Sequence, residues 1–250
     1  MPDALHIPIL ITLVFLLAGL VKGVIGMGLP LVVIGLLSLV MAPVQAIALT
    51  IIPALITNIW QFSVGPSMPV TIRRLWPMLV GTALGIWGGA AAGALSNENA
   101  SHASTALGFV IMLYVLTGLL KPPPPSPPAV DRWLAPVIGA ITGVIASATG
   151  IFVLPGVAYL QAQILDRHEL IQALGLFFTV STFALGVVVT QAGALNADNA
   201  WLSAFAVIPA FVGMALGARL RRRISQRAFR RIFLVGLFVV GARLASRAFV

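Results

Sequence analysis

The chain has 250 residues, of which 60% are hydrophobic and 8% are charged, and its formal net charge is +9. Too few polar side chains are present to cover a soluble globule, and the mean hydropathy of +1.07 is typical of a protein embedded in lipid. The absence of cysteine excludes disulfides, thiolate metal sites and cysteine nucleophiles. The three histidines, His6, His102 and His168, show no metal-ligand spacing, so neither a metal nor another cofactor is expected.

Ten apolar segments follow one another along the chain. They cover about residues 7–25, 27–42, 45–64, 75–95 and 103–120, then 133–149, 150–165, 169–192, 200–218 and 231–248. The first has no basic region before it and no cleavage pattern after it, so we expect it to stay as a helix and not to be a signal peptide. All ten are predicted to be helices, because a lipid-embedded segment must satisfy its own backbone. The first two segments of each half are short, and they are either full spans or re-entrant hairpins.

A proline-rich stretch divides the chain into two halves. Residues 121–128 contain six prolines and predict an extended polyproline spacer. We therefore expect an N-terminal membrane repeat over 1–120, a cytoplasmic linker over 121–132 and a C-terminal membrane repeat over 133–250.

The two halves resemble each other in sequence. The glycine-rich break at 19–30 recurs at 139–150, and Pro77–Gly85 matches Pro209–Gly217 at Pro, Val, Gly, Ala, Leu and Gly. With five segments per half, the second copy enters the membrane from the opposite side. The predicted fold is an all-α polytopic membrane protein of two inverted repeats, each with a broken or short helix pair followed by three transmembrane helices.

The basic residues indicate the orientation of this fold. Most lie in the connections 66–74, 121–132 and 219–231, whereas 96–102 and 193–199 contain none. The positive-inside rule places the first three connections in the cytoplasm and the other two outside, with both termini outside if all ten segments span. A nucleic-acid partner is not expected, because these charges sit between apolar helices and form no basic face.

The two glycine-rich breaks are the candidate substrate site. A helix that restarts inside a membrane presents free N–H groups and a positive dipole end to an anion, and glycine lets a ligand approach the backbone. The alternative is that these glycines are small-residue contacts between helices. Lys22, in the first break, either snorkels to a helix end or faces a polar cavity. Because all six acidic residues lie in connections or at segment ends, the site favours an anion over a cation.

Polar residues inside later segments extend the candidate site. Asn58 and Gln61 share a helix face with three-residue spacing, and Thr179, Ser181 and Thr182 lie in the corresponding segment of the second half. Such groups are either hydrogen-bond links between helices or cavity lining. The predicted substrate-binding residues are Lys22, Gly23, Gly26, Gly28, Asn58, Gln61, Gly143, Ser147, Ala148, Thr149, Thr179 and Thr182.

Several motifs resemble one known family. Gly23–Gly28, Pro43–Ala46, Asn58–Gln61, Gln172–Leu176 and Pro209–Gly217 are similar to the sulfite exporter TauE/SafE family, also called the toluene-sulfonate uptake permeases. The resemblance implies a multi-pass carrier of the bacterial inner membrane for sulfite, organosulfonates or related organic anions. Its expected partners are a small anion and the lipid bilayer. An enzyme is not expected, since the chain lacks a His-Glu-x-x-His motif and a base for its membrane serines. A passive anion channel and a non-transporting membrane scaffold remain as alternatives.

Overall fold

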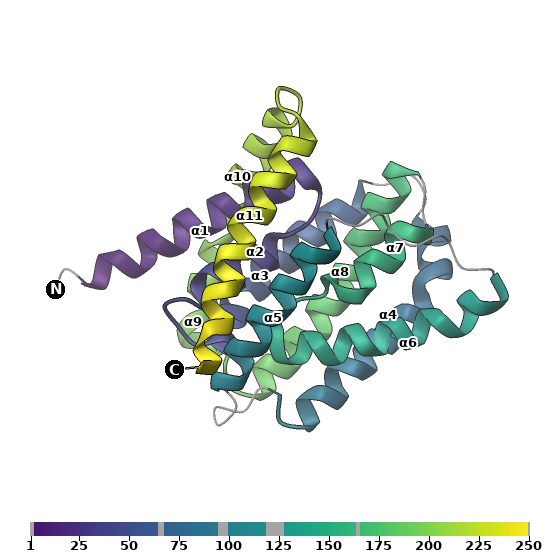
Figure 1. Cartoon of the computed structure of the whole chain (residues 1–250), viewed down its shortest axis with the longest axis horizontal. Helices are drawn as coiled ribbons and strands as arrows, with labels where there is room; N and C mark the ends of the chain where they lie inside the picture. The colour runs from purple at the N-terminus through teal and green to yellow at the C-terminus, as the bar shows by residue number, and fades with distance from the viewer. Residues whose placement is uncertain (1–2, 65–67, 95–99, 119–127, 164–165, 250) are drawn as a thin grey trace.

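The computed structural model is a bundle of helices (Figure 1). It describes residues 3–64, 68–94, 100–118, 128–163 and 166–249. No β-strand occurs within these ranges, so the predicted all-helical class is confirmed for them.

The elements of the two halves follow the predicted order. The first half contains α1 (Asp3–Ile25), α2 (Leu29–Leu37), α3 (Pro43–Ser63), α4 (Met68–Ala91) and α5 (Ala100–Gly118). The second half contains α6 (Pro128–Thr149), the π-helix η2 (Val153–Val157), α7 (Ala158–Gln163), α8 (Arg167–Gln191), α9 (Ala197–Phe205), α10 (Val207–Leu220), α11 (Gln226–Ala245) and the 3₁₀-helix η3 (Ser246–Phe249).

Helix lengths separate membrane spans from shorter elements. Four stretches are long and apolar enough to cross a membrane, namely His6–Ile25, Pro43–Ser63, His168–Gln191 and Asn199–Leu220. By contrast, α2 has 9 residues and α7 has 6. At a rise of 1.5 Å per residue, α2 is about 14 Å long, less than half of the ~30 Å hydrocarbon core. The second segment of each half is therefore too short to span, whereas α1, with 23 residues, is not.

Several helices extend beyond their apolar runs into the connections. The helix α4 begins at Met68, so Arg73 and Arg74 are helical, and only residues 221–225 separate α10 from α11. The expectation that Pro128 belongs to an extended linker is wrong, because α6 begins there. Proline fits the first turn of a helix, where its missing N–H has no helical partner. The remaining linker residues, 121–127, lie outside the described part of the chain.

Glycines bring α1 and α10 into close contact. A Cβ atom at Gly19 or Gly23 would overlap the carbonyl oxygen of Ala210 or Met214, respectively. In return, a Cβ at Gly217 would overlap the carbonyl oxygen of Leu20. Residue numbers rise together along both helices, so α1 and α10 run parallel.

The helices α4 and α6 make the same kind of contact. A Cβ at Gly139 or Gly143 would overlap the carbonyl oxygen of Met78 or Thr82. These two helices also run parallel. Their contact is equivalent to that of α1 and α10, because Gly139 corresponds to Gly19 and Met78 corresponds to Ala210 in the sequence repeat. Gly19, Gly23, Gly139 and Gly143 thus serve as small-residue helix contacts.

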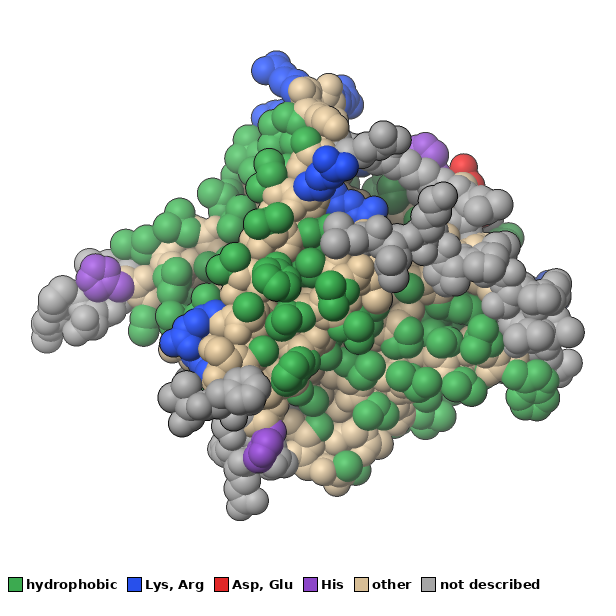
Figure 2. Space-filling model, in the orientation of Figure 1, with side chains coloured by type: hydrophobic (Ala, Val, Ile, Leu, Met, Phe, Trp, Pro, Cys, Tyr) green, Lys and Arg blue, Asp and Glu red, His purple; other side chains and the backbone are tan. Residues whose placement is uncertain are grey.

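Two other large helix pairs, α3–α8 and α5–α11, run antiparallel. In the α3–α8 pair, Gly175 meets Phe62 and Gly186 meets Ile51, so the numbers fall on one helix as they rise on the other. The helices α5 and α11 also pack together, and Arg230 of α11 donates a hydrogen bond to the carbonyl oxygen of Gly118 at the end of α5. Large apolar side chains remain exposed on the outer faces (Figure 2), as expected for surfaces that face lipid.

Candidate functional site

The first glycine-rich break ends α1 and starts α2. Gly26 and Gly28 have φ angles of 92° and 105°, which only glycine adopts without strain. The Gly26 N–H donates to the carbonyl oxygen of Lys22 at 2.7 Å and so closes the last turn of α1. This geometry fixes Lys22 in that last turn.

The Lys22 side chain is directed into the bundle. It is 3% exposed, and its Nζ donates to Thr57 Oγ1 at 3.0 Å and to Asn58 Oδ1. Of the two alternatives open from the sequence, the structure therefore has the inward-facing lysine and not the snorkelling one. A lysine ammonium has three donors, and these two bonds leave one for another partner.

The helix α3 presents both partners of Lys22. Thr57 Oγ1 donates to the carbonyl oxygen of Pro53 at 2.7 Å, so its lone pairs stay available to accept from the lysine. Asn58 Nδ2 is buried without a hydrogen-bond partner. Buried donors are rarely left unpaired, because the loss costs about 1–3 kcal/mol. This unpaired amide donor lies beside the Lys22 ammonium.

A cavity of ≈ 470 Å³ opens beside Lys22. It is lined by Lys22, Gly23, Gly26, Trp60, Gln61, Val64, Ile171, Phe211, Met214, Ala215, Ala218 and Arg221. These described residues include two basic side chains and no aspartate or glutamate. The cavity therefore combines positive charge with largely apolar walls, which we call the Lys22 cavity.

Gln61 links two helices at the wall of this cavity. Its Nε2 donates to the carbonyl oxygen of Ile171 in α8 at 2.9 Å, and Gln172 Nε2 donates back to the carbonyl oxygen of Phe62 at 3.2 Å. These reciprocal bonds hold the end of α3 against the start of α8. Gln61 thus both lines the cavity and links helices.

Arg221 is a cavity residue that the sequence analysis assigned only to a cytoplasmic connection. It is the C-cap of α10, and its N–H donates to the carbonyl oxygen of Gly217 at 2.9 Å. The sequence spacing could have indicated this position, because Arg221 lies four residues after Gly217 and therefore on the same helix face. That face packs against Gly23.

The second break lies slightly later than expected. Ala148 and Thr149 were expected to lie within it, yet both belong to the last turn of α6. The helix ends at Gly150, whose φ is 69° and whose N–H donates to the carbonyl oxygen of Ala146 at 2.7 Å. Leu154 is extended within η2, and the Leu154–Pro155 peptide bond is cis. Both breaks therefore begin with a left-handed glycine that closes the preceding helix.

A second cavity of ≈ 300 Å³ lies beside the end of α6. It is lined by Gly89, Ala92, Gly93, Ala94, His102, Ala103, Ala106, Val144, Ser147 and Ala148. We call it the Ser147 cavity. Ser147 Oγ donates to the carbonyl oxygen of Val144 at 2.7 Å. His102, which had no assigned role in the sequence, shares this cavity.

The remaining predicted site residues line neither cavity. They are Gly28, Asn58, Gly143, Thr149, Thr179 and Thr182. Asn58 accepts a hydrogen bond from Lys22 but does not line the Lys22 cavity. The Thr149 and Thr179 hydroxyls each donate to a carbonyl one turn earlier in their own helix, at 2.7 Å. Thr182 Oγ1 is buried without a hydrogen-bond partner.

Apolar helices surrounding a lysine-centred cavity define a helical membrane protein with an internal polar site. The family model described as sulfite exporter TauE/SafE matches residues 11–244. The chain therefore belongs to the sulfite exporter TauE/SafE family, as the sequence motifs predicted, and this places it among membrane transporters. Searches of curated proteins and of solved structures gave no significant match.

Proposed function

We propose that this protein is a secondary transporter of small anions and that the anion binds in the Lys22 cavity. The supporting observation is a buried lysine whose hydrogen-bond partners are the neutral oxygens of Thr57 and Asn58. A lysine inside the bilayer costs about 2.5–3.5 kcal/mol on insertion scales. An anionic ligand offsets this cost, and no carboxylate is found among the described lining residues to do so instead.

The proposed substrate is sulfite, an organosulfonate or a related organic anion. The third Lys22 donor suits an oxyanion, and the Arg221 guanidinium adds charge at the same cavity. The apolar side chains of Trp60 and Phe211 suit the carbon part of an organic anion. The family description supports a sulfur-containing anion.

Helix directions support the predicted inverted repeat. Two halves related by a two-fold axis in the membrane plane have their equivalent helices antiparallel. The pairs α3–α8 and α5–α11 meet this requirement, and the parallel pair α1–α10 has its equivalent in α6–α4. Two such halves, joined by the linker, are the architecture that we propose.

The arginine-rich turn between α10 and α11 supports the proposed orientation. By the positive-inside rule this turn lies in the cytoplasm of the inner-membrane protein. The Lys22 cavity includes Arg221 of this turn and is thereby assigned to the cytoplasmic end. The Ser147 cavity includes Gly93 and Ala94, which lead into the connection expected outside. We assign Ser147 and Ala148 to the opposite end of the transport path.

Purified protein in proteoliposomes tests the proposal. Uptake of radiolabelled sulfite, sulfoacetate and sulfate would be followed under imposed proton, sodium and membrane-potential gradients. Accumulation against the anion gradient is the expected result. Purely downhill flux would indicate the anion channel, and absence of flux for all three anions under every gradient would contradict transport of these substrates.

A further inference from the structure

An apolar groove lies on the outside of the bundle between α1, α2 and α11. It encloses ≈ 240 Å³, and all of its lining residues are apolar or glycine. Leu17 and Leu20 come from α1, Leu36 comes from α2, and Phe233 and Gly236 come from α11. Of these, Leu17 is 47% exposed, although it faces a groove that no part of the described chain fills.

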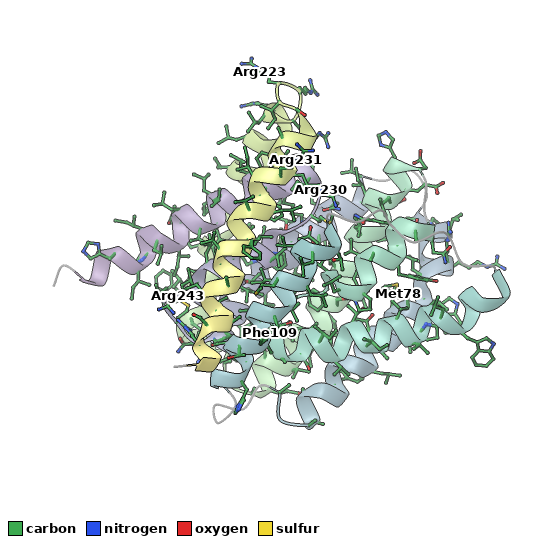
Figure 3. The ribbon with its side chains drawn as sticks, viewed as in Figure 1. Met78, Phe109, Arg223, Arg230, Arg231 and Arg243 are labelled. Atoms are coloured by element: carbon green, nitrogen blue, oxygen red, sulfur yellow. The ribbon has the colours of Figure 1, made fainter. Side chains whose placement is uncertain are left out.

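A basic hollow adjoins one end of this groove. Arg219, Arg222 and Arg223 line a space of ≈ 610 Å³ together with Leu20, which also lines the apolar groove. Figure 3 shows Arg223 at the tip formed by α10 and α11, and Figure 2 shows basic side chains gathered at this tip above a largely hydrophobic surface. Positive charge and apolar surface therefore meet at one place on the outer face.

We propose that an anionic phospholipid occupies this surface, with its phosphate on the three arginines and one acyl chain in the groove. Arginine binds phosphate with two parallel hydrogen bonds, and the cytoplasmic leaflet carries anionic lipids. The groove residues of α11 run from Phe229 to Val240, a length of about 16 Å at the helical rise. This matches one leaflet, which is about half of the ~30 Å hydrocarbon core.

The bound lipid would brace the first break. Val21 and Phe233 both line the groove, and they are the side chains nearest to a Cβ built at Gly28. Lys22 follows Val21 directly and lines a different cavity, because consecutive residues of a helix point about 100° apart. The lipid thus packs against the turn between α1 and α2, which holds Lys22 in place. Its binding does not depend on which anion is transported.

Native mass spectrometry of the delipidated full-length protein tests this site. Dioleoylphosphatidylglycerol and dioleoylphosphatidylcholine would be titrated in parallel, and the apparent melting temperature would be recorded with each. We expect one phosphatidylglycerol to bind at least tenfold more tightly than phosphatidylcholine and to raise the melting temperature. Equal binding of the two lipids, or an equal rise with inorganic phosphate, would overturn the proposal.

Two sets of variants separate the headgroup contact from the acyl-chain contact. Replacing Arg219, Arg222 and Arg223 together by glutamine should weaken phosphatidylglycerol binding at least tenfold, because each basic residue near an anionic lipid contributes roughly fivefold. Gly236→Leu should weaken binding of both lipids, since a Cβ there meets nothing within 4 Å and the side chain fills the groove without distorting the fold.

Matched controls are present elsewhere in the chain. Gly88→Leu has the same open surroundings on α4, and Arg243→Gln removes a basic residue toward the other end of α11 (Figure 3). Both should retain lipid binding. Unchanged binding in either the arginine variant or Gly236→Leu would overturn the assigned site. Because lipid binding is measured without transport, this result is independent of the flux experiment.

Discussion

Replacing Lys22 by methionine is expected to separate anion binding from folding. Methionine is unbranched and apolar, and it fills much of the same space without donors or charge. A hydrogen bond to a charged group contributes about 1.5–3 kcal/mol, so anion affinity should fall about 10- to 150-fold. Lys22→Arg should restore transport only in part, since a guanidinium differs from an ammonium in shape and hydration.

The stability of the Lys22→Met variant is not expected to fall with its anion affinity. Removing the lysine relieves an insertion cost of about 2.5–3.5 kcal/mol, while Asn58 loses the partner of its Oδ1, at a cost of about 1–3 kcal/mol. These two effects nearly cancel, so the melting temperature should stay constant or rise. Adding Asn58→Leu removes the orphaned amide, so the double variant should be the most stable of these proteins and should keep the lowered anion affinity.

The assay is anion flux per amount of protein in proteoliposomes, with thermal unfolding of the same preparations. Arg243→Gln provides the control, because it removes an exposed basic residue that does not line the Lys22 cavity. Wild-type flux in Lys22→Met would show that the transported anion does not bind to Lys22. Parallel loss of flux and of several kcal/mol of stability would show that Lys22 is a structural residue.

Three further substitutions test other parts of the site. Asn58→Asp should lower anion flux at least tenfold with the fold intact, because the new carboxylate pairs with Lys22 and competes with the anion; unchanged flux would contradict this. Gly26→Ala and Gly193→Ala both place a side chain at positive φ, at a cost of about 1–3 kcal/mol, but only Gly26 lines the Lys22 cavity. Flux should fall only for Gly26→Ala, and equal flux in the two variants would remove Gly26 from the path. Ala148→Leu should reduce the maximal flux by filling the Ser147 cavity, and an unchanged maximum would exclude that cavity.

The first break was predictable from sequence and the second less so. Gly26 and Gly28 adopt φ angles that only glycine tolerates well, and two glycines so close together after an apolar run indicate the end of α1. In the second half, Ala148 and Thr149 are compatible with a helix, and Thr149 bonds to the carbonyl oxygen of Ile145. The helix therefore continues until Gly150, the first residue there with a left-handed conformation.

Hydropathy also overestimated the helix length of the second segment in each half. Residues 38–42 are mostly apolar, yet α2 ends at Leu37 and the next helix begins at Pro43. An apolar turn between two helices has the same composition as a helix, so composition cannot mark the boundary between them. Hydropathy thus predicts which segments are buried better than where their helices end.

The partners of Lys22 depended on long-range packing. Asn58 and Gln61 were selected because they share a helix face, but no local pattern indicated that α3 would meet the end of α1. Arg221 was missed because its charge was interpreted only as a topological signal. The repeated glycine contacts bring α10 alongside α1, and this tertiary contact places Arg221 at the cavity.

The two cavities differ in charge, and this difference predicts asymmetric transport. The Lys22 cavity contains Lys22 and Arg221, whereas the equivalent helices α6 and α4 supply Ser147 and Gly89 to the other cavity. If the anion binds as proposed, it would have at least one charge-assisted hydrogen bond more at the Arg221 end, equivalent to about 10- to 150-fold in affinity. The apparent KM for sulfite should accordingly be lower in vesicles that expose the Arg221 end than in vesicles of opposite orientation. Equal KM values from the two sides would mean that both cavities lead to one shared site and that Lys22 serves each direction equally.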